Sequence, residues 1–178
     1  QFVNLESGTV YPNYDPIQND TREELRRFDL ETVHIGMDFN VNHMSAVVGV
    51  LRYGKLMVLD EISDIRDTPT MIDEIKDRYD TGRKIVIYPD ASGRSSKSVD
   101  ASKSDIGLLK EAGFKVVAPQ KNPPVRNRIV SVNSALKNAK GARRVYINSR
   151  KCEKLSSNLL EQAYDKNGTP LKSNNVDH

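Results

Sequence analysis

The sequence is poor in the residues that stabilise secreted or membrane proteins. Its 178 residues include one cysteine, Cys152, and no tryptophan. A single thiol cannot form an internal disulfide, and Cys152 stands at helical spacing from several leucines. We therefore expect Cys152 to pack in the core of a protein from a reducing compartment. No run of 18 or more apolar residues occurs, so we expect no membrane-spanning helix and no membrane partner.

Two further absences limit the chemistry. The Gly-x-x-x-x-Gly-Lys-Ser/Thr pattern of a phosphate-binding loop does not occur, so we expect no ATPase site in this chain. Three histidines are too few and too scattered to suggest a Ser/His/Asp arrangement, and we do not expect His34 or His43 to bind metal. The first residue is Gln1 rather than methionine, and we interpret the chain as a fragment of a longer protein.

The composition is that of a single globular domain. Hydrophobic residues make up 37% and charged residues 29% of the chain. The formal net charge of +3 is small and does not by itself indicate nucleic-acid binding, although clustered basic residues could still form a positive patch.

The first half of the chain predicts a β-meander followed by a crossover. Apolar and other residues alternate from Val33 to Phe39, which is typical of a strand. Two more strands are predicted at 46–51 and 56–59 around a tight turn at Tyr53-Gly54-Lys55, too close together for anything but antiparallel pairing. Thr68 is the expected N-cap of a helix that Gly82 ends. The apolar run 85–88 then predicts a buried strand, parallel to an earlier one.

The second half alternates between helices and strands. Residues 92–104, rich in Ser, Gly and Lys, are expected to form a mobile loop. We expect helices near 106–112, 129–136 and 152–163, with strands at 115–118 and 145–147. The order predicts an α/β fold with a mixed sheet, part antiparallel meander and part parallel, and helices on both faces.

Two aspartates are the most informative polar residues. Asp38 and Asp90 each follow an apolar strand, where an unpaired buried carboxylate would cost several kcal/mol. Carboxylates at adjacent strand ends can converge on Mg²⁺ or Mn²⁺, and two such ions can clamp a phosphodiester. The alternative is structural, because aspartate often forms turns and Asp90-Ala91-Ser92-Gly93 is a reasonable turn.

Basic residues gather in loops near the Asp90 end of the expected sheet. They could contact DNA phosphates, or they could be ordinary solvated loop residues. The candidates for DNA binding are Arg94, Lys97, Lys103, Lys121, Arg126 and Arg128.

Several motifs together resemble the C-terminal nuclease domain of phage terminase large subunits. The arm Gly8-Thr9-Val10-Tyr11-Pro12 is similar to the segment that joins the ATPase and nuclease of that family, and 122–147 has its order of loop, helix and strand. The resemblance covers almost the whole chain. The motifs that carry it are Gly36-Met37-Asp38-Phe39-Asn40, Val86-Ile87-Tyr88-Pro89-Asp90 and Asn174-Asn175-Val176-Asp177-His178.

The resemblance implies an RNase H-like fold, akin to RuvC resolvases, with two Mg²⁺ or Mn²⁺ ions held by three acidic clusters. Asp38 would bridge both ions, Asp90 would hold one, and Asp177 with His178 would belong to the third cluster. Related sequences often read Asp-His-x-x-Asp-Ala-x-Arg-Tyr at this place. The third ligand is therefore either Asp177 or an aspartate beyond His178.

The resemblance also implies a biological setting. Residues 1–30 would be an arm from an upstream ATPase domain, and 31–178 a nuclease domain truncated at its C-terminal end. The substrate would be concatemeric viral double-stranded DNA, cut with low sequence specificity in the cytoplasm of an infected bacterium. Portal, procapsid and small terminase subunit would be partners.

Two alternatives remain open. A RuvC or RNase H relative with another cellular task would prefer branched DNA or RNA–DNA hybrids. A non-catalytic module that docks DNA or procapsid would bind DNA without metal-dependent cleavage.

Overall fold

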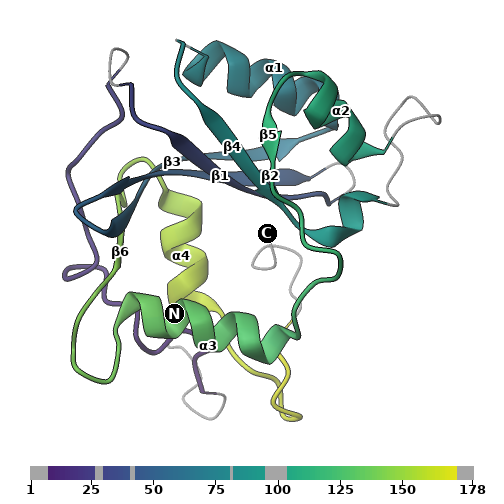
Figure 1. Cartoon of the computed structure of the whole chain (residues 1–178). Coiled ribbons are helices and arrows are strands. Elements are labelled where there is room, and N and C mark those ends of the chain that lie inside the picture. Colours follow the sequence, from purple (N-terminus) through teal and green to yellow (C-terminus); the bar gives the residue numbers. More distant parts are fainter. Residues whose placement is uncertain (1–7, 27–29, 41–42, 81, 95–103, 172–178) are drawn as a thin grey trace.

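A six-stranded mixed sheet forms the centre of the computed structural model, which describes residues 8–26, 30–40, 43–80, 82–94 and 104–171 (Figure 1). In spatial order the strands are β5 (Lys115–Val116), β4 (Ile85–Pro89), β1 (Val33–Asp38), β2 (Met44–Arg52), β3 (Lys55–Ile65) and β6 (Val145–Ile147). The meander β1–β2–β3 is antiparallel, β4 and β5 continue it parallel to β1, and β6 lies parallel to β3.

The predicted meander and its tight turn are confirmed. Tyr53 and Gly54 both adopt positive φ, 54° and 71°, as a two-residue turn between twisted antiparallel strands requires. β3 is much longer than the predicted 56–59, because its polar half finds partners elsewhere. The Tyr79 hydroxyl donates to Asp60 over 2.7 Å, and two backbone amides donate to Glu61.

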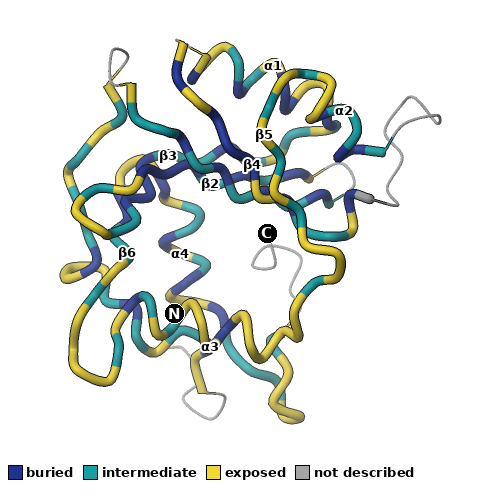
Figure 2. The backbone as a smooth tube through the Cα atoms, in the orientation of Figure 1, coloured by how far each residue is buried: buried dark blue, intermediate teal, exposed yellow. Residues whose placement is uncertain are grey.

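Helices cover both faces of the sheet, as the sequence predicts. On one face α1 (Thr68–Tyr79) and α2 (Asp105–Glu111) bury Met71, Ile75 and Leu109 against β1, β2 and β4. On the other face α4 (Glu153–Glu161) and the end of α3 (Val125–Leu136) pack over β3 and β6. Figure 2 shows that much of the central strands β1, β2 and β4 is buried.

The start of α1 differs from the prediction. Its N-cap is Asp67, whose side chain accepts a hydrogen bond from the Thr70 amide over 2.9 Å, whereas Thr68 is already helical. Thr68 is buried, and its hydroxyl donates a hydrogen bond to Asp105 over 2.6 Å. The side chain that the sequence predicts as the cap is therefore used in a contact with α2 instead.

The single thiol lies in the core, as expected. Cys152 is fully buried just before α4, and burial raises the pKa of its thiol to about 12. α4 itself is shorter than the predicted 152–163. Within the described residues, no helix has the length and apolar character needed to cross a bilayer.

The N-terminal arm, defined here as residues 8–26, follows the α4 and β6 side of the molecule (Figure 1). Thr9 forms a bridge with Ala163, and Asp20 forms a parallel bridge with Ile147 at the edge of β6. Val10 and Asn19 are almost completely buried. The arm therefore packs against α3, α4 and β6 as part of the folded domain.

Candidate active site

Asp38 and Asp90 lie at the carboxyl ends of neighbouring parallel strands. Asp38 is the last residue of β1, and Asp90 directly follows β4. The register pairs Met37 with Pro89, and the Asp90 amide donates to the Met37 carbonyl over 3.2 Å. Both aspartates are partly buried. The two strands expected to be neighbours are neighbours, and their ends bring both carboxylates to one mouth of the sheet.

A close contact couples the segments that follow the two strands. After β4 the chain turns through a short 3₁₀ helix, η1 (Ala91–Arg94). A Cβ added to Gly93 would lie 2.2 Å from the ring of Phe39, the buried residue after Asp38. Only glycine fits this approach. Asn40, one residue further along, donates to an oxygen of Asp38 over 3.0 Å.

Both oxygens of Asp90 accept hydrogen bonds. Ser92 donates to one oxygen through its hydroxyl at 2.6 Å and its backbone amide at 3.2 Å. The Asn122 side-chain amide donates to the other oxygen over 3.4 Å, and the Oδ1 atom of the same side chain accepts from the Ala91 amide over 2.7 Å. Asn122 was not among the candidates from the sequence, and only its place before two prolines suggests an ordered loop.

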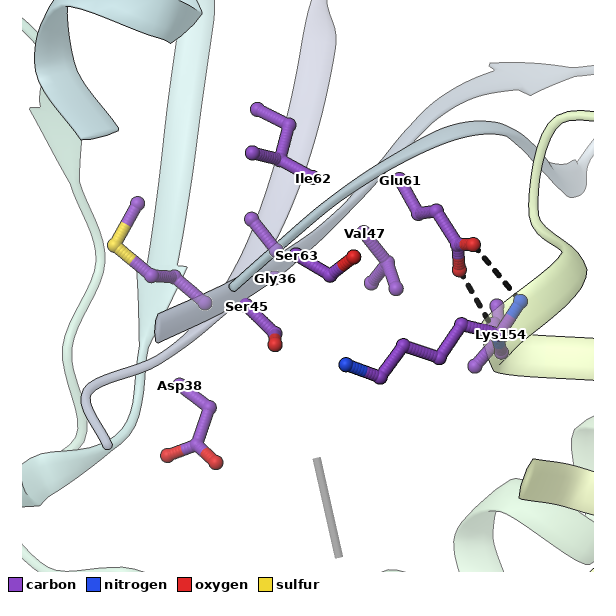
Figure 3. Close-up of a pocket in the computed structure, with 11 residues that line it drawn as sticks. Gly36, Asp38, Ser45, Val47, Glu61, Ile62, Ser63 and Lys154 are labelled. Carbon is purple, nitrogen blue, oxygen red and sulfur yellow. Dashed lines mark hydrogen bonds between the residues drawn. The ribbon is translucent and has the colours of Figure 1, made fainter. Parts of the chain in front are cut away.

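A pocket of about 240 Å³ lies on the β2–β3 side of Asp38 (Figure 3). It is lined by residues of β1, β2 and β3 and by the start of α4, including Ser45, Glu61 and Lys154. The Glu61 carboxylate accepts the backbone amides of Lys154 and Leu155, both over 2.9 Å. Glu61 therefore caps α4 instead of joining Asp38 as a free carboxylate.

Only two of the four predicted metal ligands lie within the residues that the structure describes. Asp38 and Asp90 come together, whereas Asp177 and His178 lie outside the described residues. Across the ranges that are described, no group of three His, Cys, Asp or Glu side chains is placed to hold a metal. The donor set nevertheless suits Mg²⁺, which usually binds one or two carboxylates, water and substrate phosphate.

The predicted DNA-binding residues are similarly divided. Lys97 and Lys103 lie outside the described residues, and Arg94 is the last residue of η1. Lys121 is exposed and directly precedes Asn122, so its loop passes Asp90. Two other basic residues, Arg126 and Arg128, are exposed on the first turn of α3.

Solved structures share this fold. The large terminase from the thermophilic bacteriophage D6E superposes with a TM-score of 0.71 at 19% identity, over 97% of this chain and 42% of that one. The P22 large terminase nuclease domain gives a TM-score of 0.65 at 16% identity, over 97% and 88% of the two chains. The g2p large terminase nuclease domain of bacteriophage SPP1, solved with bound Mn, gives 0.53 at 17% identity, over 86% and 85%.

The chain thus spans less than half the length of the D6E protein that it resembles. No curated protein matches the sequence. Among protein families, the one described as Terminase RNaseH-like domain matches residues 35–178, which is most of the chain. This match confirms the resemblance seen in the motifs, and the chain belongs to the family of terminase RNase H-like domains.

Proposed function

We propose that this domain is a divalent-metal-dependent endonuclease that cuts viral double-stranded DNA during genome packaging. The observation that carries the proposal is the convergence of Asp38 and Asp90 at the ends of two adjacent parallel strands. The family membership and the Mn bound in the SPP1 nuclease domain support it.

The carboxylates have distinct roles in this proposal. Asp38 would bridge two Mg²⁺ or Mn²⁺ ions, Asp90 would hold one, and Asp177 with His178 would complete the set. When bound, the ions supply an activated water and neutralise the charge that develops on the leaving 3′ oxygen. Ser92 and Asn122 hold the Asp90 carboxylate in one orientation, and Asn40 does the same for Asp38.

The substrate is proposed to be concatemeric DNA cut with little regard for sequence. Contacts to phosphates position a duplex without reading bases. The exposed Lys121, Arg126 and Arg128 stand on the loop beside Asp90 and the helix that follows it. With Arg94, Lys97 and Lys103 they are the proposed DNA-contacting residues.

The proposed setting is a packaging motor in the cytoplasm of an infected bacterium. Residues 31–178 would be the nuclease, and 1–30 would lead from an upstream ATPase domain. The large terminase of D6E, solved with ATP-gamma-S and with ADP, supports a protein of two such parts. Portal, procapsid and small terminase subunit are the proposed partners.

Nicking of supercoiled plasmid by the purified chain tests the proposal. We expect nicking with Mn²⁺ or Mg²⁺, none with EDTA, and a loss of at least about 100-fold in Asp38→Asn, because removing a metal ligand removes the activated water. Asp73→Asn is the matched control, since Asp73 is exposed on α1 on the other face of the sheet.

Three results would change the conclusion. Cleavage that survives EDTA or Asp38→Asn would contradict the proposed chemistry. DNA binding without cleavage, in this chain and in one continued past His178, would indicate a docking module. Faster cutting of branched DNA or RNA–DNA hybrids than of plain duplex would indicate a resolvase or RNase H activity.

A further inference from the structure

The pocket beside Asp38 contains one cationic side chain among the described residues that line it. Lys154, the second residue of α4, extends across the pocket toward Ser45 and Asp38 (Figure 3). The opposite wall carries the Asp38 carboxylate. A positive charge and the proposed metal-binding carboxylate therefore face the same solvent-open space, although they are 116 positions apart in sequence.

Two carboxylates fix the position of Lys154. Glu61 on β3 accepts its backbone amide over 2.9 Å and so anchors the first turn of α4. Asp64 accepts two hydrogen bonds from its Nζ atom, each 3.2 Å long. The hydrogen bond from the Lys154 ammonium is the main reason why the pKa of the Asp64 carboxyl lies below its usual value, and Asp64 is charged at neutral pH.

Stability alone does not explain this arrangement. Asp64 is 62% exposed, and an ion pair with so exposed a partner contributes little to folding. Both described hydrogen bonds of Nζ go to this one carboxylate, while an ammonium has three donors. The third donor is available to a group that enters the pocket.

We propose that Lys154 binds a backbone phosphate of the DNA strand that passes Asp38, with Asp64 holding the ammonium in place. This inference rests on the proposed nuclease function and adds a contact on the α4 side of the site. The phosphate supplies a negative charge for the ammonium and an acceptor for its third donor. The strand would then be held between Lys154 and the loop of Lys121.

The test measures binding rather than cleavage. A fluorescent 20-base-pair duplex is titrated with the chain in EDTA over a salt series, for wild type, Lys154→Met and Lys154→Arg. Each phosphate contact contributes about 0.9 to the slope of log K against log salt. We expect Lys154→Met to lower the slope by about 0.9 and to weaken binding of all sequences alike, while Lys154→Arg keeps the wild-type slope.

Two further variants separate a DNA contact from a structural ion pair. Lys110→Met removes an exposed lysine of α2, on the other face of the sheet, and should leave the slope unchanged. Asp64→Asn frees the ammonium and should also keep the slope. Thermal unfolding checks that each variant is folded.

An unchanged slope in a folded Lys154→Met would overturn the inference. So would equal loss of binding in Lys154→Met and Asp64→Asn, since that pattern belongs to an ion pair that only shapes the protein. Because the readout needs no metal and no turnover, failure of the proposed nuclease activity would appear separately, in the plasmid assay.

Discussion

At the scale of single residues, the site depends on amides and hydroxyls that orient carboxylates. Asp90 accepts from Ser92 on one oxygen and from Asn122 on the other. Asn122 in turn accepts from the Ala91 amide, so one side chain fixes both the carboxylate and the backbone beside it. Such supporting hydrogen bonds set the direction in which a carboxylate presents its lone pairs to a metal.

Asn122→Ala should therefore weaken metal use without unfolding the domain. We expect the Mn²⁺ concentration for half-maximal nicking to rise by about 10- to 100-fold, the usual cost of losing a group that orients a ligand. Gln120→Ala, a change at an exposed position of the same loop, is the control and should behave as wild type. An unchanged Mn²⁺ dependence in Asn122→Ala would show that Ser92 alone holds Asp90.

The same residues show what sequence can and cannot predict about the site. Asp38 and Asp90 could be selected from the sequence, because a carboxylate at the end of an apolar strand stands out from its immediate neighbours. Asn122 and Lys154 could not be selected, because their meaning comes from contacts 32 and 93 residues away. Polar residues in loops and on helix surfaces are common, and nothing local distinguishes these two.

At the scale of elements, the helix ends show how tertiary contacts modify local signals. The N-cap of α1 is Asp67, one residue earlier than the predicted Thr68, because Asp67 accepts hydrogen bonds from both the amide and the hydroxyl of Thr70. These hydrogen bonds hold the pKa of Asp67 below its usual value, and the bond from the Thr70 hydroxyl has the largest effect. A lowered pKa in the folded state means that the ionised cap stabilises the fold.

Asp67→Ala should lower the free energy of unfolding by about 1 kcal/mol at pH 7, the usual cost of removing a helix cap. Because folding lowers this pKa, the contribution is present above the unfolded value of 3.8 and is lost as pH falls through the folded value. The difference in free energy of unfolding between wild type and variant should thus become smaller below about pH 4. Urea denaturation at several pH values measures it, with the exposed Asp73→Ala on the same helix as control. A free-energy difference that does not change with pH would contradict the proposed contribution of the ionised Asp67 carboxylate.

Every predicted strand exists, and the order strand, helix, strand correctly predicts a parallel crossover, which runs from β3 through α1 to β4 and places β4 parallel to β1. Their lengths were less predictable. β3 continues to Ile65 through Asp60, Glu61 and Asp64, a polar stretch that local propensity assigns to a loop. Its carboxylates are satisfied by α1 and α4, elements that follow it in the chain.

At the scale of the whole molecule, the N-terminal arm ties together the layer of α3, α4 and β6. Asn19 is completely buried and donates to the carbonyls of Leu136, at 3.0 Å, and Val145, at 2.9 Å. The Oδ1 atom of the same side chain accepts from the Arg143 guanidinium. Tyr14 packs in the same layer, where its hydroxyl lies 2.6 Å from that of Ser156. One short segment thus satisfies polar groups from the end of α3, β6 and α4.

Asn19→Ala should destabilise the domain by more than about 2 kcal/mol, because it leaves two buried carbonyls and a guanidinium short of partners. The midpoint of urea unfolding measures the loss. Asn127→Ala, at an exposed position of α3, should change stability by less than about 0.5 kcal/mol. Similar midpoints for the two variants would mean that the arm contributes little to the fold.

The arm has a further consequence for how copies of this domain meet. The sheet terminates in strands of two and three residues, β5 and β6, which offer little backbone for a neighbouring chain to pair with. At β6 the arm occupies that edge, since Ile147 donates to the Asn19 carbonyl over 2.8 Å and accepts from the Thr21 amide over 3.1 Å. The arm thus covers backbone donors and acceptors at the edge of β6, and we expect a protein shortened to start at residue 31 to self-associate more readily through this edge.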